Sequence, residues 1–354
     1  MQFGIFDHME QLAPRPGEGP GEGLGALYEE RLRMLEFADA AGFARYHKAE
    51  HHFTVLDSAP SAMLFFAAAS QRTKRIRLGS LASLLPFYHP LRLIEEICAI
   101  DHLTGGRLDI GAGKGISPVE HVIWGNDPDA AAARTVEALT ILRSGLTSSR
   151  LDHAGPGFAF QDAPLVMAPV QKPHPPIWWP GNAAFAASHR LNTVVAGPQA
   201  AVKAQVARYR ELVAACEDDW NPGVARPIVG AMRHIYVGPT RAAALERARE
   251  AWKAYDANLA SLWRARGGEP VGSPTLDGDL DKAMEANLVV AGDADDVVAH
   301  VRSLRDEADL DYFVGTFAWG DLTHAEYMAS IALFADAVVR PLSANVDAGP
   351  SRAA

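Results

Sequence analysis

The stretch that decides the fold is Ala49-Glu50-His51-His52-Phe53, which directly follows the strand-like run Arg45-Tyr46-His47-Lys48. Its two adjacent imidazoles stand where a predicted strand ends and a loop begins. In α/β proteins, the groups that carry chemistry gather at the carboxyl ends of parallel strands. The stretch therefore predicts an α/β fold and makes His51 a candidate catalytic residue.

Strand-like and helix-like segments alternate outward from this stretch along nearly the whole chain. The strands are predicted over residues 3–6, 45–49, 76–85, 107–112, 177–179, 192–196, 228–237 and 312–316. Eight strands separated by helices favour a parallel sheet with right-handed crossovers, and closing that sheet gives an eight-stranded (β/α) barrel of the TIM type. A doubly wound sheet is the alternative, but Asp7-His8-Met9-Glu10 after the first strand lacks the glycine-rich dinucleotide fingerprint.

Two insertions and a tail interrupt this pattern, which otherwise predicts a single domain over residues 1–342. A small hairpin is expected at about residues 155–170. Residues 256–285 are polar, glycine-rich and poorly patterned, and we expect a mobile excursion there, because long irregular loops in compact domains are usually functional or disordered. Residues 343–354 are expected to be a disordered tail.

The composition is that of an ordinary soluble enzyme. The chain has 354 residues, of which 48% are hydrophobic and 21% charged, and its formal net charge is -10. An acidic chain without a basic block is a poor partner for nucleic acid or an anionic membrane surface. Two distant cysteines give neither a disulfide framework nor a metal-binding spacing. The amino terminus reads as a first strand and not as a signal peptide, so we expect a cytoplasmic protein.

His51 is the first candidate for chemistry, because an imidazole accepts or donates a proton near neutral pH. The plainer interpretation, a polar residue bonded to a backbone carbonyl at a strand end, stays open. Strand alternation would turn His51 to the face opposite Glu50 and His52, so the three side chains cannot converge on one ion while the strand continues. We therefore expect no catalytic metal.

Four motifs in order along the chain, the first of them the opening stretch, carry a resemblance to a known family. On these motifs, the chain resembles the luciferase-like monooxygenases, a family of flavin-dependent barrels. The resemblance extends from the first strand to the closing helix. Its specific parts are Ala49-Glu50-His51-His52-Phe53, Leu85-Pro86-Phe87-Tyr88-His89-Pro90-Leu91-Arg92, Thr104-Gly105-Gly106-Arg107-Leu108 and Gln171-Lys172-Pro173-His174-Pro175-Pro176.

The resemblance implies roles for individual residues around a flavin ring. His51 matches the family's catalytic histidine beside the reactive edge of the ring. Leu81-Ala82 matches a cis peptide bond without proline that presses on the isoalloxazine. The small side chains of Ala82 and Ser83 would let the ring come close.

The phosphate end of the flavin departs from the family pattern. Lys114 matches a basic residue, usually arginine, that grips the phosphate, and a lysine offers a point charge in place of a bidentate fork. The loop at residues 179–184 is shortened and lacks the hydroxyls that the family places there. The resemblance therefore implies that Asn182 and the backbone N–H groups of the following helix bind the phosphate in this loop.

The activity that the resemblance implies is oxygenation of a small, apolar organic substrate with reduced FMN and dioxygen. A separate flavin reductase would supply the reduced FMN, and the chain would form a homodimer. Trp178, Trp179 and Trp319 are candidates for an apolar pocket wall, although aromatic residues at strand ends are as often core. Two alternatives stay open: a deazaflavin-dependent oxidoreductase on the same barrel, and a flavin-binding barrel without catalytic activity.

Overall fold

A closed barrel of eight parallel strands forms the centre of the computed structural model, which describes residues 1–11, 23–270 and 277–343. One series of pairings runs from β1 through β2, β3 and β5 to β8, and another runs from β1 through β12 and β10 to β9. A bridge between Trp178 and Asn192 joins β8 to β9 and closes the circle. The strands are β1 (Gln2–Asp7), β2 (Arg45–Lys48), β3 (Arg77–Ser80), β5 (Leu108–Gly113), β8 (Ile177–Trp178), β9 (Thr193–Val195), β10 (Val229–Val237) and β12 (Tyr312–Thr316).

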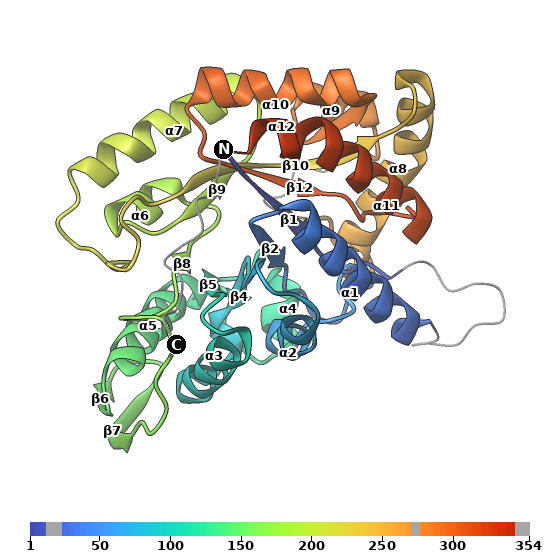
Figure 1. Ribbon diagram of the computed structural model, residues 1–354. Helices are drawn as coiled ribbons and strands as arrows, with labels where there is room; N and C mark the ends of the chain where they lie inside the picture. Colours follow the sequence, from blue (N-terminus) through green and yellow to red (C-terminus); the bar gives the residue numbers. More distant parts are fainter. Residues whose placement is uncertain (12–22, 271–276, 344–354) are drawn as a thin grey trace.

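Helices surround this barrel, as Figure 1 shows. They are α1 (Leu24–Ala41), α2 (Ala62–Arg72), α3 (Pro90–Thr104), α4 (Pro118–Ile123), α5 (Ala131–Thr147), α6 (Ala183–Ser188), α7 (Gln199–Ala214), α8 (Arg241–Arg264), α9 (Leu280–Glu285), α10 (Ala294–Ala308), α11 (His324–Phe334) and α12 (Arg340–Leu342). Within the described ranges, no helix combines the length and the apolar character needed to cross a bilayer. The eight-stranded α/β barrel predicted from the sequence is confirmed.

Side chains of alternating strand residues contribute to two of the three hydrophobic clusters among the described residues, and the third lies between α8, β11 (Val289–Gly292) and Trp319. One set packs outward against the helices and includes Phe3, Ile5 and Tyr46. The other set fills the barrel itself and includes Phe6, Ala49, Leu81, Trp178 and Tyr312. This division follows from the two-residue period of a strand, which sends neighbouring side chains to opposite faces. Side chains at the carboxyl ends of the strands therefore point either into the barrel mouth or toward the helices.

A hairpin insertion is present, but it begins earlier than the predicted range of residues 155–170. Its strands are β6 (Arg150–Ala154) and β7 (Ala159–Pro164), which pair antiparallel beside α5. The first strand thus precedes the predicted range, and residues 165–170 lie beyond the second strand.

The excursion predicted over residues 256–285 is wrong in its first and last parts. Helix α8 continues to Arg264 and buries Leu259, Ala260 and Trp263, and α9 occupies Leu280–Glu285. The strand β11 (Val289–Gly292), which pairs with β10, was not predicted. Polar residues on the outer face of α8 obscured its apolar stripe, whereas residues 271–276 and the tail beyond Ser343 lie outside the described residues.

Candidate functional site

His51 lies three residues beyond the end of β2 and is held at two points. Its backbone N–H donates to Asp57 Oδ2 at 2.9 Å, and its ring Nδ1 lies 3.2 Å from Glu120 Oε1. The imidazole is 12% exposed and the Glu120 side chain 2%. A carboxylate that accepts the Nδ1 proton fixes the tautomer and leaves Nε2 free to accept or donate a proton. His51 is therefore oriented as a proton-transfer group requires.

Glu120 was missed from the sequence because its pattern has a common structural explanation. Ser117-Pro118-Val119-Glu120 opens α4, and such a serine three residues before a glutamate is typical of a capping box. The Ser117 hydroxyl does accept from the Glu120 backbone N–H at 3.4 Å, but the Glu120 carboxylate contacts His51 instead of the cap. Its Oε2 is buried without a hydrogen-bond partner among the described residues. The side chain thus serves the histidine and not the helix.

Glu50 and His52 form a separate pair, as strand alternation predicted. His52 Nε2 lies 3.0 Å from Glu50 Oε1, and the Tyr88 hydroxyl donates to Glu50 Oε2 at 2.8 Å. Burial raises the pKa of Glu50, although the bonds from His52 and Tyr88 oppose the shift. In the described part of the chain, no group of three or more His, Cys, Asp or Glu side chains is arranged to hold a metal ion.

A buried ion pair supports the backbone on which His51 stands. Lys48 Nζ lies 2.7 Å from Asp57 Oδ1 and also donates to the carbonyls of Ala49 at 2.8 Å and His8 at 3.1 Å. Both side chains of the pair are fully buried. Since Asp57 also accepts from the His51 N–H, one network connects the ends of β1 and β2. This network fixes the position of His51 relative to the barrel.

The segment after β3 has the small side chains expected of a ring-binding surface. The Leu81–Ala82 peptide bond is cis, and the Leu81 N–H donates to the Lys48 carbonyl at 2.8 Å. The Ser83 hydroxyl donates to Ser80 Oγ at 2.9 Å. A Cβ added at Gly113 would lie 3.0 Å from the Ala82 Cβ, so a larger residue there would crowd this surface. The arrangement fits a flat ring against the ends of β3 and β5.

Lys114 and Asn182 lie at the rim and are far less constrained. Lys114 follows β5, its side chain is exposed, and its carbonyl accepts from His121 Nε2 at 2.8 Å. Asn182 is also exposed, and its Oδ1 accepts from the Phe185 N–H at 3.0 Å as the cap of α6. The amide oxygen is therefore already engaged. The phosphate-binding roles of both residues stay predictions.

Aromatic side chains that the sequence did not single out stand beside the His51 region. Phe53 is 55% exposed and Trp124 46%, with ring centroids 5.8 Å apart, and Phe87 stacks on Trp124 at 5.8 Å. By contrast, Trp178 and Trp319 are fully buried in the cores. The apolar wall at the rim is therefore formed by Phe53, Phe87 and Trp124, while these two tryptophans fill the interior.

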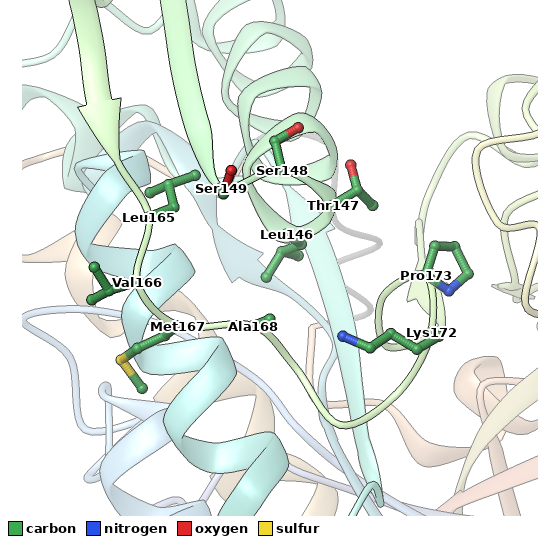
Figure 2. Close-up of a pocket in the computed structure, with 10 residues that line it drawn as sticks. All are labelled: Leu146, Thr147, Ser148, Ser149, Leu165, Val166, Met167, Ala168, Lys172 and Pro173. Atoms are coloured by element: carbon green, nitrogen blue, oxygen red, sulfur yellow. The ribbon is translucent and has the colours of Figure 1, made fainter.

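A hollow of about 440 Å³ lies elsewhere, before β8 at the amino-terminal end of the barrel. Figure 2 shows its lining, which comes from the end of α5, the segment after β7, and Lys172 and Pro173. None of the residues predicted for the functional site lines it. Because catalytic sites of such barrels lie at the opposite end of the strands, this hollow is not the candidate active site.

Comparisons with known proteins identify the family of the chain. The profile of the luciferase-like monooxygenases matches residues 1–309. An uncharacterized protein of Sinorhizobium fredii, y4wF, is 36% identical over 91% of this chain and 92% of its own length. The oxygenase component of a flavin-dependent trigonelline monooxygenase from Acinetobacter baylyi is 28% identical over 71% of this chain and 69% of its own.

Two solved structures share the fold. The monooxygenase RslO1 of Streptomyces bottropensis superposes with a TM-score of 0.83 at 24% identity, covering 97% of this chain and all of that one. The oxygenating constituent of 3,6-diketocamphane monooxygenase from Pseudomonas putida, solved with FMN, gives 0.77 at 18% identity over 96% and 98%. With a family profile that matches most of its length, the chain belongs to the luciferase-like monooxygenase family.

Proposed function

We propose that the protein is a flavin-dependent monooxygenase that uses reduced FMN and dioxygen to oxidise a small, apolar organic molecule. The observation that carries this proposal is the pair of His51, after β2, with the buried Glu120, next to the cis Leu81–Ala82 segment at the end of β3. The two segments follow neighbouring strands and are linked by the Leu81–Lys48 hydrogen bond. In this proposal, the proton-transfer group lies beside a surface that accepts a flat ring.

The residues of this chain that would hold FMN are Leu81, Ala82 and Ser83 at the ring, with Lys114 and Asn182 toward the phosphate. Bound reduced FMN supplies two electrons and activates dioxygen, which is chemistry that belongs to the cofactor. His51 Nε2 holds or transfers a proton at the reacting centre, and Glu120 keeps the imidazole in the tautomer that allows it.

The aromatic rim supports the apolar character of the substrate. Phe53, Phe87 and Trp124 present ring faces beside His52 and the loop that carries His51. An apolar entrance favours hydrophobic molecules and excludes water, which would otherwise divert the oxidation. The proposed substrate therefore enters across this rim.

Partners follow from the same proposal. The Acinetobacter relative is one component, the oxygenase, of a flavin-dependent monooxygenase. We extend this arrangement to the present chain, with a separate reductase that delivers reduced FMN transiently. A homodimer remains part of the proposal.

A fluorescence titration of the purified protein with FMN and, separately, with a deazaflavin tests the cofactor assignment. We expect FMN to bind with a Kd on the order of micromolar and the deazaflavin at least about tenfold more weakly, a difference of about 1.4 kcal/mol. Glu120→Gln, which keeps the shape of the side chain, should bind FMN as wild type does. Tighter binding of the deazaflavin would replace the proposed function with a deazaflavin-dependent one, and binding of neither cofactor would refute both.

A further inference from the structure

A second group of polar side chains is buried beside His51 and is not used by the proposed chemistry. It consists of His8, Glu10, His234 and Tyr255, where α8 covers the barrel mouth. The His8 ring centroid lies 5.7 Å from that of His51 and 5.9 Å from that of Tyr255, and the rings of His234 and Tyr255 are 4.4 Å apart. The group therefore adjoins the site of the proposed reaction.

Three polar atoms of this group lack partners among the described residues. They are His8 Nδ1, Glu10 Oε1 and His234 Nε2, in side chains whose residues are at most 8% exposed. The other Glu10 oxygen is satisfied by the Gly320 N–H at 3.0 Å and the Asn258 amide at 3.1 Å. Buried polar atoms are nearly always paired, and an unpaired one is strongly unfavourable. The His8 and His234 rings both pack against Tyr255. Burial and the nearby Glu10 carboxyl raise the pKa of the Tyr255 phenol, so one ligand oxygen could reach these unpaired atoms.

The group is uncharged near neutral pH. Burial lowers the pKa of His234 to about 3. Burial and, to a smaller extent, the neighbouring His51 lower the pKa of His8 well below its ordinary value. Burial raises the pKa of Glu10 to about 8, so this carboxyl is mostly protonated. The nearby Lys48 is already paired with Asp57. A dry site without net charge disfavours an ionic ligand and accepts an uncharged hydrogen-bonding group.

We propose that His8, Glu10 and His234 form a subsite that binds an uncharged oxygen function of the substrate, such as a carbonyl or hydroxyl, beside His51. The ring of Tyr255 closes the subsite from the side of α8. The subsite would make the substrate an oxygen-bearing molecule with an apolar body, anchored so that its reacting part faces the flavin surface. That the bound molecule is oxidised rests on the proposed function, whereas its binding requires only the side chains of the subsite.

Ligand-observed saturation-transfer NMR on the FMN-loaded protein tests the subsite with three probes of similar shape: cyclohexanone, methylcyclohexane and cyclohexanecarboxylate. We expect cyclohexanone to bind about five- to tenfold more tightly than methylcyclohexane, which is the range expected for one neutral hydrogen bond, and the carboxylate to bind most weakly. His234→Phe, which keeps a ring but no hydrogen-bonding nitrogen, should abolish the preference for the ketone. His234→Gln should retain it within about twofold.

Matched variants separate binding from folding. Tyr209→Phe on α7 removes a buried hydrogen bond to the Leu191 carbonyl, before β9, and should leave the binding of all three probes unchanged. Should His234→Phe fail to fold, Glu10→Met removes the unpaired oxygen and should likewise abolish the preference. Equal binding of ketone and hydrocarbon by wild type, no binding of any probe, or an unchanged preference in His234→Phe or Glu10→Met would overturn the subsite and leave a cluster filled by water.

The FMN affinity of each sample is measured separately. If the protein does not bind FMN, the probes are tested on the protein alone, and a preserved preference for the ketone would then contradict the flavin chemistry alone. Normal FMN binding without that preference would contradict the subsite alone.

Discussion

The two sides of the barrel mouth are built differently. On one side, His51 is nearly buried and fixed by Asp57 and Glu120, whereas on the other, Lys114 and Asn182 are exposed at the rim. A proton-transfer group must be held within a fraction of an ångström, so its support belongs in the interior. A phosphate carries a charge that acts over a longer distance, so a flexible lysine in solvent is sufficient. The difference predicts large effects on the buried side and small ones at the rim.

Removal of the imidazole gives the largest expected effect. In His51→Ala, the oxygen-transfer step should slow by about 10²-fold or more, the usual contribution of a general acid or base, while FMN still binds. Single-turnover kinetics of the reduced FMN complex mixed with dioxygen measure this step. His52→Ala is the control, because His52 turns toward Glu50, and it should stay within about threefold. Equal losses in both variants would refute the division between the two histidines.

The buried ion pair below His51 should control stability. Lys48→Met leaves the Asp57 carboxylate without its partner in the interior, and the free energy of unfolding should fall by about 3–5 kcal/mol. Urea denaturation measures the loss. Arg150→Ala in the hairpin, which breaks an exposed pair with Asp162, should cause no measurable change. A similar stability for the two variants would mean that Lys48 does not support the buried side of the mouth.

Glu10 should make stability depend on pH. Its pKa is raised by burial from 4.5 to about 8, so the folded state binds a proton that the unfolded state has released in this range. Stabilisation from this group is fully present below pH 4.5 and is lost as the pH rises through 8, with a slope of at most about 1.4 kcal/mol per pH unit.

Glu10→Gln removes this titration and provides the comparison. Urea denaturation from acid to alkaline pH measures the unfolding free energy of both proteins. Relative to the variant, wild type should lose a few kcal/mol of stability over this range, at about the slope given above. The histidines with lowered pKa values titrate in both proteins and cancel in the difference. A difference independent of pH would show that the Glu10 carboxyl is already ionised in the folded state.

The barrel could be predicted from the sequence because segments with the apolar spacing of strands alternate regularly with segments that have the apolar spacing of helices. In each segment, this spacing marks the face that is buried. The sequence also predicted the separation of His51 from Glu50 and His52, since that follows from backbone geometry alone. The polar surface of α8 hid the last turns of this helix, residues 256–264, whose buried side carries Leu259 and Trp263, and such a segment is recognised only when its partner in the fold is known. The local sequence pattern was therefore enough to predict features that are set within a single strand or helix.

Glu120 shows where this reasoning ends. It is 69 residues from His51 along the chain, and its local pattern has a complete explanation as a helix cap. The unpaired atoms of His8, Glu10 and His234 come from the segment after β1 and from β10, which only the closed barrel brings together. Pairings of this kind depend on tertiary contacts and leave no signal in the spacing of residues.

Lys114→Ala should have the smallest effect, because its charge is exposed and weakened by solvent and salt. We expect the Kd for FMN to rise by about three- to fivefold, in keeping with less than about 1 kcal/mol for an exposed charge pair. Riboflavin, which lacks the phosphate, should bind both proteins equally, and Lys203→Ala on α7 should change neither affinity. Lys114→Arg should tighten FMN through a bidentate contact. An equal loss for riboflavin would move Lys114 from the phosphate to the ring, and a loss of a hundredfold would show that the rim is as tightly organised as the buried side.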